Sequence, residues 1–364
     1  MRRPLLRAPI RYQISSCQRW QHLRQRPISL QTMSRPRRPA ALPLQDGVSA
    51  SCAVVHGGPW PSALDFLAAR LPVLHRDEWA KRFARGEVLD AQGAALAASA
   101  PCREGQRLFY YRRLEAEPAA PEAPRVLHQD DTLVVVDKPH FMPVTPGGRF
   151  IQRSLLVQLK RMLGLPDLAP LHRIDRETAG LVMFAVRPDV RAAHQALVRD
   201  RRIDKLYEAV APDVPALATP RTHASRLQED AERFFLSREV PGTPNSCSHI
   251  ARVAAAGAGH ALYHLRPITG QRHQLRLHML ALGAPILGDA FYPTVLHGPE
   301  GHDDSACPLQ LLARELAFDD PLTGQRRSFR SRRQLQAALH GASAPGMTGS
   351  PDAPGTPAAS TGPA

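Results

Sequence analysis

The segment from Leu171 to Leu181, LHRIDRETAGL, places one acidic residue between two arginines. Asp175 follows Arg173 by two positions and directly precedes Arg176. The apolar run at 181–186 that comes next is typical of a buried strand, so Asp175 is expected on a tight loop before it. Neighbouring cations favour the charged form of a carboxyl group, which suits a nucleophile or an electrostatic anchor. At this point a weak ion pair in an ordinary loop is an equal alternative.

Two further segments carry chemically active side chains, KLYEA at 205–209 and RPITGQRHQLRLH at 266–278. In the second, a turn at 269–271 is predicted to start a helix. Arg272 and Arg276 would then share one face, since they are four residues apart. Their guanidinium groups suit phosphate or carboxylate oxygens. His273 and His278 are not expected to bind a metal, because a spacing of five gives no shared face and no third ligand is evident.

The main domain is predicted to span residues 125–340 and to be an α+β domain with a largely antiparallel sheet. Strand patterns outnumber helix patterns in it. A strand, a turn and a second strand are expected within 126–139, further strands at 181–186, 205–211, 249–256, 261–266 and 314–319, and helices at 154–163, 188–200 and 331–339.

Residues 55–113 are predicted to form a separate small domain. Helices are expected at 62–71, with a Ser62 cap, and at 76–86, followed by strands at 88–90 and 107–111. A helix pair with basic residues before a short hairpin resembles the S-four-type RNA-binding domain. The alternative is a helical decoration on an enzyme. Residues 114–124, rich in Pro, Ala and Glu, are expected to be a semi-rigid linker.

The net charge of +14 and the pI near 10.4 favour a polyanionic partner, but the charge is unevenly spread. The ten arginines of residues 1–40, a stretch without Asp or Glu, supply most of it. Residues 1–54 are predicted to be a disordered basic segment and 341–364 a disordered tail. The arginine-rich start could also be a transit peptide, or sequence upstream of an initiator at Met33.

Cysteine usage and hydropathy indicate the surroundings of the protein. The five cysteines form no Cys-x-x-Cys pair, which fits a reducing cytosol better than a disulfide framework or a zinc site. No apolar run approaches the roughly 20 residues that cross a bilayer, so no membrane association is expected. We predict a cytoplasmic protein, or an organellar one if the N-terminus is a transit peptide.

The segments together resemble the RluA-type pseudouridine synthases. HRIDRETAG at 172–180 is similar to the family signature His-Arg-Leu-Asp-x-x-Thr-Ser-Gly, with Ile174 for leucine and Ala179 for serine. KLYEA at 205–209 and TGQRHQLRLH at 269–278 are similar to the second and third family motifs, with Gln271 where arginine is usual. VVVDKP at 134–139, PILGDAFY at 285–292 and PLTG at 321–324 add support, so the likeness covers roughly residues 125–330.

This resemblance implies an isomerase that converts uridine to pseudouridine in structured RNA, without metal or cofactor. Asp175 takes the position of the catalytic aspartate, which attacks ribose C1′ or base C6. Tyr207 takes that of the tyrosine that stacks on uracil, and Arg276 that of the arginine that pairs with the aspartate. Arg173 matches the residue that fills the gap left by the flipped base. RNA-binding roles are expected for Arg173, His172, Arg272, His273 and Lys205.

The resemblance further implies a monomer that acts on 23S rRNA, on a tRNA stem-loop, or on both, hence in rRNA or tRNA processing. Two other functions are alternatives to the isomerase. An RNA-binding homologue without activity would lack Asp175 or Tyr207, and both are present. A nucleoside hydrolase or glycosidase also uses an aspartate at an anomeric carbon, but it needs a second carboxylate as acid, and Glu177 is the near candidate.

Overall fold

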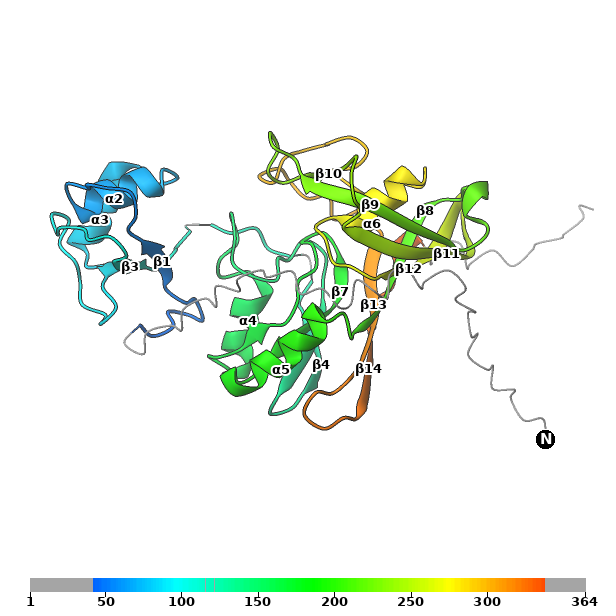
Figure 1. The fold of residues 1–364 in the computed structure, drawn as a ribbon, viewed down its shortest axis with the longest axis horizontal. Coiled ribbons are helices and arrows are strands. Elements are labelled where there is room, and N and C mark those ends of the chain that lie inside the picture. The colour runs from blue at the N-terminus through cyan, green and yellow to red at the C-terminus, as the bar shows by residue number, and fades with distance from the viewer. Residues whose placement is uncertain (1–41, 115, 121, 338–364) are drawn as a thin grey trace, which may run out of the picture.

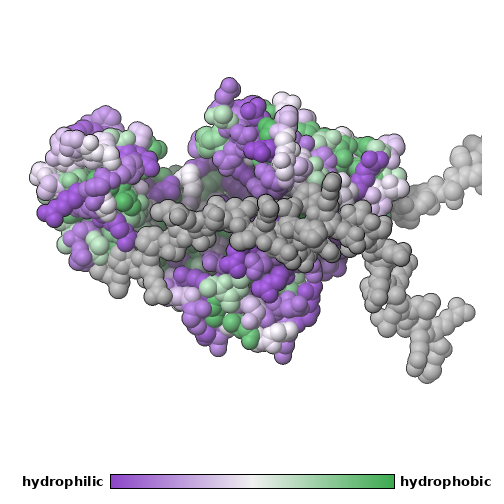
Figure 2. Space-filling model, viewed as in Figure 1, coloured by the Kyte–Doolittle hydropathy of each residue, from purple (hydrophilic) through white to green (hydrophobic). Residues whose placement is uncertain are grey.

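The computed structural model describes residues 42–114, 116–120 and 122–337 (Figure 1). The predictions for residues 1–41 and 341–364 lie outside this range. Within the described residues, no helix is both long and apolar enough to cross a membrane. Hydrophilic residues predominate over the face of the molecule drawn in Figure 2.

The N-terminal unit combines two helices with a three-stranded sheet in the order β1-β3-β2. Its elements are β1 (Ser51–Val54), α2 (Ala63–Arg70), α3 (Arg76–Ala84), β2 (Val88–Leu89) and β3 (Arg107–Tyr110). Both helices and the hairpin partners were predicted, and Ser62 caps α2 by accepting the Asp65 N–H. The predicted boundary at residue 55 is wrong, because β1 pairs with β3 from Ser51 onward. Strand β1 was not predicted, because it is short and has no regular apolar pattern.

The basic residues of α3 are largely neutralised by carboxylates. Arg76 pairs with Asp65 at 2.6 Å, and Arg85 with Glu87 at 3.0 Å. Lys81 and Arg82 both approach Glu78, at 4.0 and 3.7 Å. This helix therefore offers less net positive charge than its sequence suggested, and the likeness to an S-four-type RNA-binding domain stays a prediction.

The catalytic-domain sheet has eleven strands and includes the path β10-β9-β11-β12-β8-β13-β7-β5-β4, with β14 beside β13 and β6 beside β7. Only β13 and β7 pair in parallel, so the predicted mainly antiparallel α+β class is confirmed for the described residues. The strands are β4 (Arg125–Gln129), β5 (Leu133–Lys138), β6 (Ala169–Pro170), β7 (Ala179–Ala185), β8 (Asp204–Pro212), β9 (Arg221–Glu229), β10 (Ser237–Val240), β11 (Ser246–Gly257), β12 (His260–Pro267), β13 (Leu311–Asp319) and β14 (Arg326–Arg330).

Helices pack against both faces of this sheet around β5, and one helix packs near β9, β10 and β11. They are α4 (Leu155–Leu163), α5 (Pro188–Arg199), the short 3-10 helix η2 (Pro215–Leu217) and α6 (Gln274–Ala281). Strand β5 is buried throughout, because its odd-numbered apolar residues share a core with α5 and its even-numbered ones share a core with α4. This explains its continuous apolar run. Helix α6 packs near β9, β10 and β11.

Two segments behave differently from their sequence pattern. The helix predicted at 331–339 does not start at Ser331, since the Ser331 hydroxyl and the Arg332 N–H both donate to the buried Asp137, each at 2.8 Å. The predicted linker is tied down by Glu117, whose carboxylate accepts the N–H groups of residues 151, 152 and 153.

Gly180 allows the close approach of β7 and β13 beneath the Asp175 loop. Its φ of +111° is unfavourable for other residues, and an added Cβ would lie 2.3 Å from the Ala313 carbonyl oxygen. We expect Gly180→Ala to lower the free energy of unfolding by about 3 kcal/mol or more, from strain and overpacking together. Urea denaturation measures this. Gly164→Ala is the control, because Gly164 also has positive φ but open space around it, and it should lose only about 1 kcal/mol. Equal losses would contradict the steric argument.

Candidate active site

A cleft of about 810 Å³ opens where the β7, β8 and α6 segments meet, and all eight predicted site residues line it. The sheet explains this convergence. Ala313 of β13 is paired with Gly180 of β7 on one side and with Tyr207 of β8 on the other. The Asp175 loop, which directly precedes β7, therefore lies one strand away from Tyr207. The lining residues predicted from the sequence are His172, Arg173, Asp175, Lys205, Tyr207, Arg272, His273 and Arg276.

Arg276 is the partner of Asp175, as predicted, and it also serves two other carboxylates. Its Nη1 lies 3.8 Å from the Asp175 Oδ2 and 3.6 Å from the Glu177 Oε2. Its tightest contact is bidentate, from Nε and Nη2 to Asp289 at 2.7 and 2.5 Å. The guanidinium carbon lies 5.0 Å from the Phe291 ring centroid. Such a cage holds the arginine in one orientation toward the cleft.

Asp289 belongs to the site through its contacts with Arg276, and the sequence motifs did not predict it. It lies in the segment PILGDAFY, which was used only as evidence of family likeness. Its carboxylate accepts the N–H groups of Phe291 and Tyr292 as well as the two Arg276 bonds, so it connects the loop to the arginine. No spacing rule signals such a contact, because Asp289 follows α6 in an irregular loop.

The prediction that the neighbouring arginines keep Asp175 charged needs correction. Burial raises its pKa, and the Arg276 charge opposes this rise. The adjacent arginines are not its partners, because Arg176 pairs with Asp303 at 2.5 Å and with Glu177 at 2.9 Å, and Arg173 is exposed. The side chain of Asp175 keeps 26% of its surface exposed toward the cleft. Its negative charge therefore depends on Arg276 rather than on its sequence neighbours.

This environment leads to an expected pH dependence. If the Asp175 carboxylate must be ionised to react, then kcat/KM should fall tenfold per pH unit below the pKa of Asp175 in the free protein. Because burial raises that pKa above its usual value of 3.8, the fall should start at a higher pH than for an exposed aspartate. Initial rates on RNA between pH 4 and 8 test this. A flat profile down to pH 4 would contradict it.

Tyr207 and Lys205 face the same cleft from β8. Burial, together with the nearby Asp175 charge, raises the pKa of the Tyr207 phenol, so the hydroxyl stays protonated and can donate a hydrogen bond. Burial lowers the pKa of the Lys205 ammonium. An aromatic ring with a protonated hydroxyl, beside a partly exposed carboxylate, suits a flat, polar ligand such as a base.

Two histidines predicted to bind RNA form hydrogen bonds within the protein. His172 Nε2 accepts the Met183 N–H at 3.2 Å, and His273 Nδ1 is bonded to the Tyr292 hydroxyl at 2.8 Å. Both residues are buried, and burial lowers the pKa of each to about 3, so both are neutral. Both residues line the cleft, and their RNA contacts stay a prediction.

Arg272 does not share a helix face with Arg276, so that prediction is wrong. Helix α6 begins at Gln274, and His273 before it has a left-handed conformation with φ of +55°. Arg272 thus turns away and donates to the Phe234 carbonyl oxygen at 2.6 Å. The side chain of Gln274 accepts the Gln271 N–H and so fixes the loop before the helix.

Lys138 supports the Asp175 loop from beneath and was not predicted as a site residue. Its buried Nζ donates to the carbonyl oxygens of Pro139, Met142 and Arg176 at 3.0, 2.7 and 3.0 Å. Burial lowers its pKa to about 7, while the charges of Glu177 and Asp175 act against this shift. Three carbonyl acceptors match the three N–H groups of the charged form.

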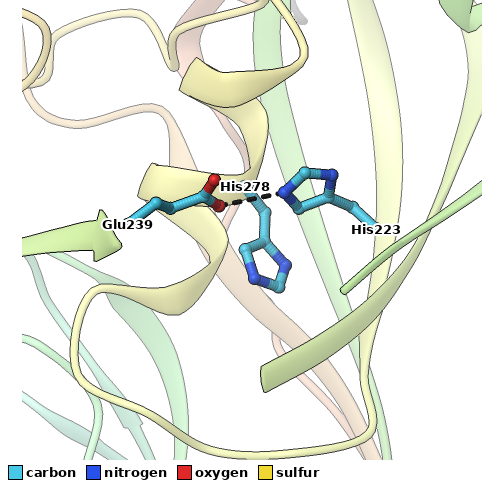
Figure 3. Close-up of side chains that lie close together, drawn as sticks. All are labelled: His223, Glu239 and His278. Atoms are coloured by element: carbon cyan, nitrogen blue, oxygen red, sulfur yellow. Dashed lines mark hydrogen bonds and ion pairs between the residues drawn. The ribbon is translucent and has the colours of Figure 1, made fainter. Parts of the chain in front are cut away.

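His278 lies with His223 and Glu239 rather than with His273 (Figure 3). Their ligating atoms lie within 4.8 Å of one another, a grouping that could be taken for a metal site. His223 is bonded to Glu239 at 2.9 Å, and its ring meets that of His278 edge to face at 4.7 Å.

Hydrogen bonds account for this cluster. The Gln274 side-chain amide donates to the Ser248 hydroxyl oxygen. The Ser248 hydroxyl in turn donates its own proton to His278 Nδ1. His278 Nε2 then carries the proton and donates to Ser246, whose hydroxyl donates to the Ser225 carbonyl. A cation would have to displace the Nε2 proton and break this chain. We therefore assign the cluster to support of Gln274 and the cleft loop.

The class of protein follows from comparison with known sequences. A family model described as RNA pseudouridylate synthase matches residues 132–281, which include all eight lining residues above. The RNA pseudouridine synthase slr1592 of Synechocystis sp. is 30% identical over 240 residues, 65% of this chain and 80% of that protein. The dual-specificity RNA pseudouridine synthase RluA of Pasteurella multocida is 30% identical over 219 residues, 56% of this chain and 90% of that protein.

The human pseudouridylate synthase RPUSD2 is 34% identical over 184 residues, but the match spans only 33% of its length and 50% of this chain. The matches to the two bacterial proteins cover most of each. The chain is therefore an RNA-modifying isomerase. It belongs to the RluA-type family of RNA pseudouridine synthases, and the predicted family is confirmed.

Proposed function

We propose that this protein isomerises specific uridines of a structured RNA with Asp175 as the nucleophile. The observation that carries the proposal is the partly exposed Asp175 carboxylate, held 3.8 Å from the buried Arg276. It is the acidic side chain of the catalytic signature, and it faces the same cleft as Tyr207. Covalent catalysis by a carboxylate divides one difficult exchange into easier steps.

The reaction balances without an external reagent. The bond from C1′ to N1 of the uracil breaks, the base turns, and a bond from C1′ to C5 forms. C5 loses its proton to the solvent and N1 gains one, so substrate and product have the same composition. Attack by Asp175 at C1′ or at C6 is compatible with this balance. No oxidant or reductant is required, and we propose a reaction without cofactor.

The other cleft residues fit the remaining steps. The uridine has to leave the RNA stack, because its reacting atoms cannot be reached within a helix. We propose that Arg173, which is exposed and lies two residues from Asp175, fills the gap in the stack. Tyr207 can then stack on the uracil, and its protonated hydroxyl can donate to the base. Loops and bulges make this flipping less costly.

Release of tritium from RNA labelled at C5 of uridine tests the function. We expect release with the unaltered protein and none with Asp175→Ala. Release that persists in the variant would overturn the role of Asp175. Free uracil as product would favour a nucleoside hydrolase. That reading is weakened because both carboxylate oxygens of Glu177, its candidate acid, face arginines at 2.9 and 3.6 Å.

We further propose ribosomal RNA, a tRNA stem-loop, or both as substrate. Support comes from the family and from the dual specificity that the name of the Pasteurella multocida relative states. Sequencing of pseudouridine sites in total RNA, with and without the protein, identifies the targets. The monomeric state remains a proposal that light scattering can check.

The compartment also remains a proposal, cytoplasmic or organellar. Fusions of a fluorescent protein to the full chain and to the chain from Met33 onward separate the two. Organellar import of the first fusion alone would identify residues 1–32 as a transit peptide, whereas equal cytoplasmic fluorescence would favour the cytoplasm.

A further inference from the structure

An aromatic side chain lies in water at the rim of the cleft. Phe234, in the loop between β9 and β10, has 72% of its surface exposed and lines the cleft. A ring of this size gains free energy when it is buried, so its exposure at this place calls for an explanation. A single exposed apolar residue elsewhere would need none.

Phe234 is the outer member of a row of rings that ends at Arg276. Its ring meets Phe235 edge to face at 5.7 Å, and Phe235 lies 5.4 Å from Phe291. Phe291 in turn lies 5.0 Å beneath the Arg276 guanidinium. One wall of the cleft is therefore aromatic from the site of reaction to the solvent.

The loop that carries Phe234 is held in place. Arg272 donates to the Phe234 carbonyl oxygen at 2.6 Å. Asp230 accepts the N–H groups of Glu232 and Arg233, and the Leu236 N–H donates to the Arg233 carbonyl oxygen. The ring is thus presented on an ordered turn beside an arginine that is itself partly exposed.

A ligand that fits this rim needs a flat apolar face and a nearby anion. An unpaired RNA base with its phosphate has both, and the arginines Arg173 and Arg272 line the same cleft. An apolar peptide would offer no anion to these arginines. Stacking of a base on an aromatic side chain contributes about 1–3 kcal/mol and tolerates any base.

We propose that Phe234 stacks on an unpaired base next to the flipped uridine and so helps to select substrates with an open loop. This inference rests on the proposed flipping of a uridine into the cleft. It adds a binding residue outside the three sequence motifs of the family likeness, on the segment 213–248 that those motifs leave out.

The first test compares kcat/KM for tritium release from total RNA at fixed salt. Phe234→Ala should lower it by about 5- to 140-fold, the equivalent of one stacked base, with most of the loss in KM. Phe234→Trp should retain it. The control is Leu296→Ala, since Leu296 is 74% exposed but does not line the cleft.

The second test reads stacking directly. In the Asp175→Ala background, which prevents turnover, emission of the Phe234→Trp variant should be quenched by the same RNA. The Asp175→Ala variant that keeps Phe234 gives the reference, because its emission comes from the native tryptophans alone. The proposal would be overturned if Phe234→Ala left kcat/KM unchanged. It would also be overturned if Phe234→Ala lowered kcat/KM but Phe234→Trp neither retained it nor showed quenching by the RNA. Absence of tritium release from the unaltered protein would instead overturn the proposed function.

Discussion

Asp175→Asn should abolish pseudouridine formation, with a loss of about 10⁴-fold or more in kcat, as is typical when the reacting group of an enzyme is removed. The amide has nearly the same shape as the carboxylate but cannot act as an anionic nucleophile. Single-turnover tritium release, followed over hours with excess protein, gives the range needed. Activity above about one per cent would contradict the role of Asp175.

The same variant should not unfold the protein, which separates catalysis from structure. Burial disfavours the charged form of Asp175, as its raised pKa indicates, so a neutral amide should leave the midpoint of urea denaturation equal or higher. RNA binding should persist. Asp213→Asn is the matched control, because Asp213 is ion-paired with Arg252 at 2.6 Å outside the cleft and should leave activity unchanged.

Arg276→Met should have the second largest effect, and it should affect both stability and activity. It leaves three carboxylates without their shared cation, two of them almost fully buried. Removal of one partner of a buried ion pair costs about 3–5 kcal/mol. The pKa of Asp175 should rise further, because the Arg276 charge lowers it, so the acid limb of the rate profile should move to higher pH. Denaturation curves and pH–rate profiles measure the two effects.

A second substitution distinguishes the two effects. Arg276→Met combined with Asp289→Asn should regain part of the lost stability, since the main buried carboxylate is then neutral, but should regain no activity. Arg314→Met is the matched control, because Arg314 forms another buried pair, with Glu208 at 2.5 Å. It should destabilise the protein without moving the acid limb. A shift of equal size in that control would contradict a specific role of Arg276.

The residue patterns were sufficient to predict most elements of the catalytic domain. Long alternating or continuous apolar runs, as in β5, β7 and β8, predict strands. The buried side chains of a strand are consecutive or alternate residues, so the sequence shows them directly. Where a single long-range polar contact or an unusual backbone conformation decides a helix start, the pattern was misleading. The Asp137 carboxylate binds Ser331 and so replaces a predicted helix start, and the left-handed His273 delays α6.

The sequence by itself determined which side chains could do chemistry. Asp175 within its signature, Tyr207 in KLYEA and Arg276 after its turn were all predicted, and the cleft brings them together. Such motifs are local in sequence, so their residue types and spacing can be read directly.

Only the tertiary structure decided the electrostatics and the surroundings of that site. It excluded the neighbouring arginines as partners of Asp175, added Asp289 as the anchor of Arg276, and brought Phe234 to the rim. These contacts join residues that lie far apart in the chain, and their strength depends on burial. Burial is a property of the packed sheet and helices, and so spacing along the sequence does not encode it.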